Sequence, residues 1–357
     1  MIKLQHMNYR FATGLFLLFL LLSATIDGQT VRYAVTRSPL SSDRFDEFCP
    51  VYYKKGIVFC SNRDLDAVNK YSDLSGKNFI KIFYIDTTAV MSWQDARLFS
   101  KNLKTKLNDG PVSFSRDLNT VYFSRNIYAD GASTELSSPR NKLGLFTSEF
   151  EGEWKKPHDF RLNNEWYNIT APCLSPDGTM LFFASDKPGG YGGSDLYYCL
   201  WQKDYWGDPV NMGQLVNTQG NESYPFMCRD GELFFSSDGH GGLGGKDIYF
   251  TRLIDSVWQK PVHLNAPINS KYDDFALITD PLMKKGYFSS NRDGTYDIFS
   301  FTSVIPQLFY STEQRINLYC YKFRGGTKLE IDPGSMQYEW TFGDTGKSEG
   351  DDAEHCF

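Results

Sequence analysis

The feature of this chain that most constrains its fold is an internal repeat with a period of about 50 residues. The segment LFFASDKPGGYGGSDLYY, which starts at Leu181, recurs as LFFSSDGHGGLGGKDIYF from Leu233 and, with a shorter middle, as GYFSSNRDGTYDIFSF from Gly286. Two sets of side chains keep the same spacing, namely Asp195, Asp247 and Asp297, and Trp154, Trp206 and Trp258. Looser copies begin at Ile57 and Val121, so five repeats are visible.

Each repeat has the pattern of a four-stranded antiparallel sheet. APCLSPDGTMLFFAS, from Ala171, consists of two short strands around Pro-Asp-Gly, which favours a tight turn because Pro presets one φ and Gly accepts a positive one. A glycine-rich loop, a third strand (DLYYCLW) and an outer strand in YWGDPVNM follow. The chain has 28 Phe and 22 Tyr, which favour strands. An all-β fold is therefore expected.

Repeated four-stranded units predict a β-propeller, in which each blade buries its faces against its neighbours. We expect five blades over residues 29–302, with QTVRYAV from Gln29 supplying the outer strand of the last blade and so closing the ring. A six-bladed propeller that uses a segment after Phe301 is the alternative.

The two ends of the chain differ from the repeats. Residues 1–28 have the pattern of a signal peptide, with Lys3 and Arg10 before the apolar run GLFLLFLLL. That run is shorter than the ~20 helical residues a membrane span requires, so an exported chain without a transmembrane span after signal removal is expected. Residues 303–314 are a predicted linker, and 315–357 a separate β segment.

Several repeats resemble a known family. SPDGTMLFFASDKPGGYGGSDLYY and PINSKYDDFALITD resemble the WD-repeat-like propeller units of TolB and of Bacteroidetes-type OmpA-family envelope proteins. The resemblance implies a location in the periplasm or at the outer membrane, a scaffold role with protein partners in the cell envelope, and no catalytic residues or cofactors. YEWTFGDTGKSEG, from Tyr338, resembles the opening of an immunoglobulin-like domain of the PKD type, of which 315–357 would be only a part, since such a domain needs about 80 to 100 residues.

Charge and cysteine content exclude some functions. The net charge is −6 and no basic stripe is present, which argues against a nucleic-acid partner. The seven cysteines show neither CxxC pairs nor Cys/His clusters, so no metal site is expected. Cys320 and Cys356 are the candidate disulfide, because they fall together in the C-terminal segment.

Polar side chains precede the innermost strand of most repeats. Each lies three positions ahead of a proline that recurs between repeats, or of the residue in its place. They are candidates for a binding site at one mouth of the central channel, and they comprise Glu47, Asn108, Glu222 and Asp273 with the adjacent Asp274. Carboxylates converging from several blades are also the arrangement that glycoside hydrolases use. Ile169 interrupts the set, and we assign no catalytic residue.

The other repeated residues have structural and functional interpretations. Asp195 and Asp247 end glycine-rich loops that distantly match calcium-binding repeats, but hydrogen bonding of each carboxylate to backbone amides is favoured. The three repeated tryptophans would pack between blades or, alternatively, stack on a sugar. The sequence therefore predicts a non-enzymatic envelope scaffold or protein-interaction module, and the alternative is a carbohydrate-binding or glycoside-hydrolase propeller that takes a glycan at the channel mouth.

Overall fold

The computed structural model describes residues 32–63, 76–88, 92–128, 138–228, 231–304, 320–324, 339–341, 347–349 and 352–356. The chain divides into one compact unit at Tyr33–Ser303 and a second that contains the C-terminal strands. Predictions for the signal peptide, for most of the linker and for much of 315–357 lie outside the described residues.

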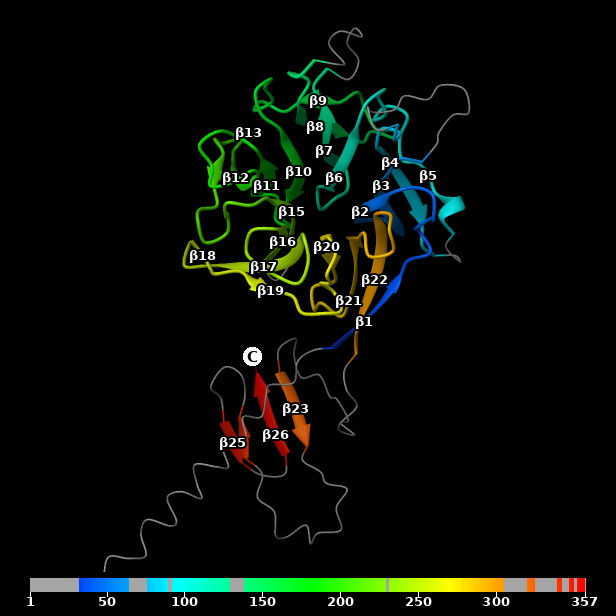
Figure 1. The fold of residues 1–357 in the computed structure, drawn as a ribbon. Helices are drawn as coiled ribbons and strands as arrows, with labels where there is room; N and C mark the ends of the chain where they lie inside the picture. Colours follow the sequence, from blue (N-terminus) through cyan, green and yellow to red (C-terminus); the bar gives the residue numbers. More distant parts are fainter. Residues whose placement is uncertain are drawn as a thin grey trace, which may run out of the picture. The chain divides into compact units, whose positions relative to one another are not determined.

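The five repeats form five antiparallel sheets arranged around a common axis, which confirms the all-β, five-bladed prediction (Figure 1). Each blade is built on four strands that run from the channel outwards. Blade 1 contains β2 (Glu47–Tyr53), β3 (Gly56–Ser61), β4 (Lys81–Asp86) and β5 (Arg97–Leu98), and blade 2 contains β6 (Asp109–Phe114), β7 (Thr120–Asn126), β8 (Leu143–Glu149) and β9 (His158–Asp159). A short 3-10 helix, η1 (Trp93–Asp95), precedes β5.

Blades 3 and 4 each have one short strand more than expected. Blade 3 contains β10 (Ile169–Leu174), β11 (Met180–Ser185), β12 (Asp195–Gln202), β13 (Tyr205–Trp206) and β14 (Val210–Asn211). Blade 4 contains β15 (Glu222–Met227), β16 (Glu232–Ser237), β17 (Asp247–Ile254), β18 (Val257–Trp258) and β19 (Val262–His263). The predicted single outer strand in YWGDPVNM is thus two strands, β13 and β14, which pair with different parts of β12.

Blade 5 is completed by the N-terminal strand of the described chain. Its inner strands are β20 (Asp274–Thr279), β21 (Lys285–Ser290) and β22 (Asp297–Val304), and β1 (Arg32–Arg37) lies next to β22 at the outer edge (Figure 1). The Ser38 N–H donates to the Ile298 carbonyl at 2.8 Å, and the side chains of Thr36 and Ser300 are 2.9 Å apart. Phe301 lies within β22, so the described residues form five blades and not six.

The core lies between neighbouring blades. The second strand of every blade carries a fully buried phenylalanine at the same place; these are Phe59, Phe123, Phe183, Phe235 and Phe288. Trp154, Trp206 and Trp258 are 4%, 6% and 7% exposed. Each packs against an aromatic ring of the preceding blade, as Trp206 does against Tyr122, with ring centroids 6.1 Å apart and an Nε1–H bond to the phenol oxygen. Such burial leaves these rings no open face for a sugar.

The described part of the C-terminal unit consists of two small antiparallel pairs. β23 (Cys320–Arg324) pairs with β26 (Asp352–Cys356), and β24 (Glu339–Thr341) pairs with β25 (Lys347–Glu349). The register places Cys320 opposite Cys356. Their side chains lie outside the described part of the structure, so the disulfide and the PKD-type assignment stay predictions. Among the described residues, no helix has the length and apolar character that a membrane crossing requires.

Candidate functional site

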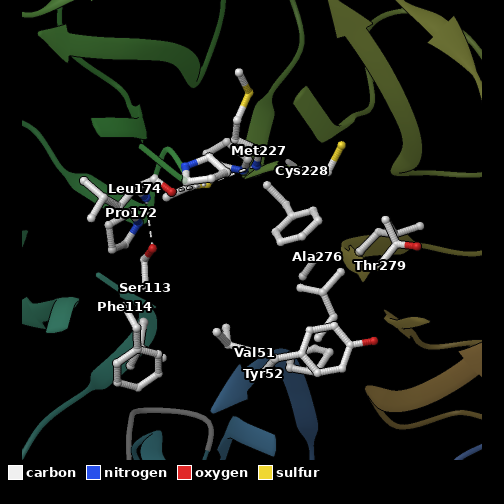
Figure 2. A pocket seen from close by; sticks show the side chains of 18 of the residues that line it. Val51, Tyr52, Ser113, Phe114, Pro172, Leu174, Met227, Cys228, Ala276 and Thr279 are labelled. Atoms are coloured by element: carbon white, nitrogen blue, oxygen red, sulfur yellow. Dashed lines mark hydrogen bonds between the residues drawn. The ribbon is translucent and has the colours of Figure 1, made fainter. Parts of the chain in front are cut away.

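A cavity of about 770 Å³ occupies the central channel and is bounded by the innermost strands of all five blades. Its walls are the second halves of β2, β6, β10, β15 and β20 and the turns that follow them. Figure 2 shows Val51, Phe114, Leu174 and Met227 around this space. The lining is mainly apolar, and its volume falls within the range of ordinary ligand pockets.

A β-bulge in each innermost strand shapes the inner end of the cavity. The pairing register shifts by one residue in all five strands. The residue at the bulge has a positive φ in four blades, namely Cys49 (51°), Ala171 (50°), Tyr224 (52°) and Ala276 (51°). In blade 2 the equivalent residue is Pro111, which follows Gly110 at φ 104°. Bulges re-aim the side chains beside them, here towards the channel.

Serine hydroxyls of neighbouring blades hold these bulges in place. The N–H of Cys49 donates to Ser289 Oγ at 2.9 Å, and the N–H of Ala171 donates to Ser124 Oγ at 3.0 Å. Further along the wall, the Leu174 N–H donates to Ser113 Oγ at 2.9 Å (Figure 2). Because the strained backbones of Cys49 and Ala171 are fixed by the adjacent blade, this part of the cavity wall is preformed.

Prolines remove hydrogen-bond donors from the channel wall. Pro50, Pro172 and Pro225 each follow the bulge residue and line the cavity. The innermost strand is the free edge of its blade, where an N–H would otherwise be available to pair with an incoming strand. Since proline has no N–H, these positions disfavour the addition of a strand and leave side chains as the main contacts for a ligand.

The open end of the cavity has a balanced charge. Arg116 and Lys285 contribute two cations, while Asp177 and Asp280 contribute two anions. Hydrogen bonds from the Ser175 hydroxyl and from Thr179 lower the pKa of the Asp177 carboxyl below its usual value. The Asp177 carboxyl therefore stays ionised at neutral pH, and the rim has as many basic as acidic side chains.

The carboxylates predicted at the channel mouth do not line this cavity, and a binding role for them stays a prediction. Glu47, Glu222 and Asp274 are each 0% exposed. Asn108 and Asp273 lie one residue ahead of the equivalent position, where their N–H groups donate to Asn126 Oδ1 and Asn291 Oδ1. The cavity is lined by the bulge residues and the residues that follow them, whereas the carboxylates precede the bulge in the sequence.

The buried carboxylates instead anchor the segments that enter each blade. Glu47 accepts from the Ser42 N–H at 2.9 Å, and Glu222 accepts from the Thr218 N–H at 2.8 Å. The Arg63 guanidinium lies 3.0 Å from Glu47, yet burial outweighs it and raises the pKa of the Glu47 carboxyl. Each carboxylate is thus held by a Ser or Thr four or five residues earlier, so its role is structural.

Asp109 belongs to the same set and was missed in the sequence. It is 0% exposed, accepts from the Thr105 N–H at 2.8 Å and pairs with Arg125 at 2.9 Å and Lys81 at 3.6 Å. Burial raises the pKa of Asp109 and lowers that of Lys81. The signal that identifies it is the threonine four residues before it, which matches Thr218 before Glu222.

The repeated aspartates occupy the same place, the first residue of the third strand in blades 3, 4 and 5. Asp195 accepts from the N–H groups of Tyr191 (2.6 Å) and Gly192 (3.1 Å). A Cβ on Gly192 would lie 2.3 Å from the Gly220 carbonyl oxygen, so this loop position requires glycine. The described residues contain no cluster of three or more His, Cys, Asp or Glu side chains suited to a metal ion.

The buried cysteines do not have the environment of reactive thiols. Cys60, Cys173 and Cys199 are at most 5% exposed. Burial raises the pKa of Cys173 to about 12 and that of Cys199 to about 11. Because the thiolate is the nucleophile, these side chains act as small apolar groups.

No protein-family model and no curated protein matches the sequence. Similar solved structures include TolB from Acinetobacter baumannii (12% identity, TM-score 0.42, covering 74% of this chain and 56% of that chain). Others are Trypanosoma rangeli sialidase (10%, 0.41, 76% and 60%) and a protein of unknown function from Dyadobacter fermentans (11%, 0.44, 73% and 77%). The chain thus spans little more than half of the A. baumannii TolB. These similarities concern the fold alone.

Proposed function

We propose that this protein is a non-enzymatic interaction module of the cell envelope, and that its channel cavity receives a short apolar segment of a partner protein. The observation that carries the proposal is the cavity of about 770 Å³ with apolar walls that all five blades build together. A preformed pocket of this kind binds without a large ordering cost.

The chemistry of the walls favours an apolar peptide segment over a sugar. Sugars require many hydrogen-bonding groups, whereas prolines at Pro50, Pro172 and Pro225 remove backbone donors where the blades face the channel. Apolar side chains such as Leu174 and Met227 offer contact area, and the mixed charges of Arg116 and Asp177 at the rim suit a polypeptide backbone with flanking charges of either sign.

The glycoside-hydrolase alternative loses its main support. That hypothesis depended on carboxylates that converge at the channel mouth, but Glu47 and Glu222 are fully buried and hydrogen-bonded, and Glu47 is also paired with Arg63. The placement in the envelope rests on the signal-peptide pattern of residues 1–28 and on the resemblance of the repeats to envelope propellers.

Site-specific photocrosslinking in cells tests the proposal. A benzophenone amino acid at Tyr52, which lines the cavity and is 41% exposed, should form an adduct with a partner polypeptide. The same amino acid at Val257, which is 56% exposed on the outer strand β18, is the matched control and should not trap that partner.

A blocking variant makes the test decisive. Leu174→Glu places a charge on the cavity wall and should abolish the Tyr52 adduct. The proposal is wrong if no polypeptide is trapped at Tyr52, if the trapped molecule is a glycan, or if the adduct persists in the folded Leu174→Glu protein.

A further inference from the structure

The ring of bulge residues at the inner end of the cavity is strongly uneven. Four of its members are small, namely Cys49, Pro111, Ala171 and Ala276, and the fifth is Tyr224. All five line the cavity. A ring that contains four small side chains and one large one leaves space on the axis for the large one alone.

The Tyr224 side chain of blade 4 packs on blade 5 and lies near the Cys49 and Cys60 thiols of blade 1. It leaves β15 and packs on Phe275 of blade 5, with ring centroids 4.8 Å apart. It also contacts a buried cluster that contains Phe48 and Cys49 of blade 1. Blade 5 separates blade 4 from blade 1 in the ring, so a side chain that joins them must extend over the channel.

The backbone of Tyr224 is held in a conformation that this residue rarely adopts. Its φ of 52° costs about 1 kcal/mol or more for a bulky residue, which persists only where the surroundings determine it. Burial, followed by the proximity of Cys49 and Cys60, raises the pKa of the Tyr224 phenol. The phenol therefore lies near the blade 1 thiols, and the partly buried Tyr224 side chain borders the cavity.

The cavity ends at this level. Its walls include the bulge residues and the residues that follow them, such as Val51 and Phe226. They do not include the residues just before the bulge, such as Phe48, Ser223 and Phe275. The boundary between the two sets falls at the bulge residues, among which Tyr224 has the large side chain.

We propose that Tyr224 is a plug that closes the channel and makes the cavity a blind pocket, so that a segment entering from the open end stops at its ring. The plug itself does not depend on the proposed function. Only its consequence, that Tyr224 limits how far an apolar segment enters, rests on that function.

Thiol accessibility tests the plug without any ligand. Cys49 borders the cavity but is 3% exposed, and Tyr224 packs against the buried cluster to which Cys49 belongs. The folded full chain is treated with methyl methanethiosulfonate, which is small enough to enter the pocket. Trypsin then separates Cys49 from Cys60, because Lys54 and Lys55 lie between them, and mass spectrometry gives the modification rate of each.

Cys49 should be protected in the wild type and in Tyr224→Phe, which keeps the ring. In Tyr224→Ala its modification should be at least about tenfold faster, since reactivity follows exposure, while Cys60 behind it should change less. Tyr224→Leu, which retains part of the packing on Phe275, replaces the alanine variant if that one does not fold.

Two results would overturn the plug. One is a folded Tyr224→Ala or Tyr224→Leu protein in which Cys49 stays as protected as in the wild type. The other is wild-type Cys49 that reacts as fast in the folded protein as in urea. Faster Cys49 modification together with a failed photocrosslink at Tyr52 would leave the plug in place and refute the proposed function alone.

Discussion

Removal of the Arg37 guanidinium should weaken the closure of the propeller more than removal of its partner carboxylate. Arg37 lies on β1, and its Nη2 is 3.0 Å from Asp297 Oδ1 on β22. The Asp297 side chain is 0% exposed, whereas that of Arg37 is 30% exposed and also pairs with Asp43 at 2.5 Å. Arg37→Ala therefore leaves the buried Asp297 carboxylate without its cation. Asp297→Asn leaves the Arg37 guanidinium paired with Asp43 and in contact with water.

The expected magnitudes follow from this asymmetry. Removing one member of a fully buried ion pair costs about 3 to 5 kcal/mol, and the partial exposure of Arg37 reduces this to about 2 to 3 kcal/mol for Arg37→Ala. For Asp297→Asn we expect about 1 kcal/mol, because a neutral hydrogen bond can replace the ionic one. The double variant should resemble Asp297→Asn.

Urea unfolding at several pH values measures the loss of unfolding free energy in each variant and the direction in which this loss changes with pH. Burial raises the pKa of Asp297 above 3.8, and Arg37 lowers it. Without Arg37 that pKa rises further, so the cost of Arg37→Ala is full at neutral pH and shrinks as the pH falls below the folded-state pKa, where the folded carboxyl is neutral with or without Arg37. The reasoning is refuted if Arg37→Ala costs no more than Asp297→Asn at neutral pH, or if its cost grows on acidification.

Four further changes test other parts of the structure. Asp195→Ala removes the acceptor of two loop N–H groups and should lower the free energy of unfolding by roughly 2 to 3 kcal/mol in urea, with no response to calcium chelation; a calcium-dependent loss would contradict the assigned role. Ser289→Ala leaves the buried Cys49 N–H without its acceptor and should cost about 1 to 3 kcal/mol by chemical denaturation, more than Ser236→Ala, whose bond to Ala276 is longer at 3.4 Å. Trp206→Ala should cost about 3 to 5 kcal/mol in the same assay, and a loss below 1 kcal/mol would argue against packing between blades. Since burial raises the pKa of Glu47 above 4.5, its contribution to stability is present below 4.5 and is lost as the pH rises through the raised value, so the fall of unfolding free energy towards neutral pH should be shallower in Glu47→Gln; an unchanged slope would refute this assignment.

The architecture could be predicted because each repeat contains the turn residues and the alternating apolar residues that define the strands of one blade. Asp195, Asp247 and Asp297 recur at one place in each of three blades, and alternating apolar residues define the strands around them. The segment RSPLSSDRFDEFCP, from Arg37, resembles PINSKYDDFA, from Pro267, and so predicts that the strand before it completes blade 5, where β1 lies beside β22. Local turn chemistry and a fixed period are both written in the sequence.

Two of the predicted site residues, Asn108 and Asp273, are one position out of register because proline was used as the marker. Pro50 and Pro225 follow the bulge, but in blade 2 Pro111 occupies the bulge itself, and blade 5 has Leu277 instead of proline. Counting back three residues from Pro111, and from Ala276 as the supposed proline equivalent in blade 5, gave Asn108 and Asp273, one residue ahead of the equivalent Asp109 and Asp274. A one-residue error in a strand exchanges one face for the other.

The pocket and its floor could not be derived from the pattern. The period of the repeat predicts that five inner strands surround an axis. It does not predict which half of each strand lines a cavity. Tyr224 stands out only after the bulges align it with Cys49, Ala171 and Ala276, because its neighbours in sequence are ordinary strand residues. A bulge depends on pairing with a second strand, so no local signal announces it.

The antiparallel pairing of β1 with β22 has a mechanical consequence. Thr36 lies beside Ser300 and Ser38 beside Ile298, so Arg32 and Val304 fall at the same end of one sheet. The chain thus enters and leaves the propeller at the same edge of blade 5. Tension that draws those two ends apart would break the hydrogen bonds between β1 and β22 one after another, starting from that end. The other blades would bear load only after β1 has separated.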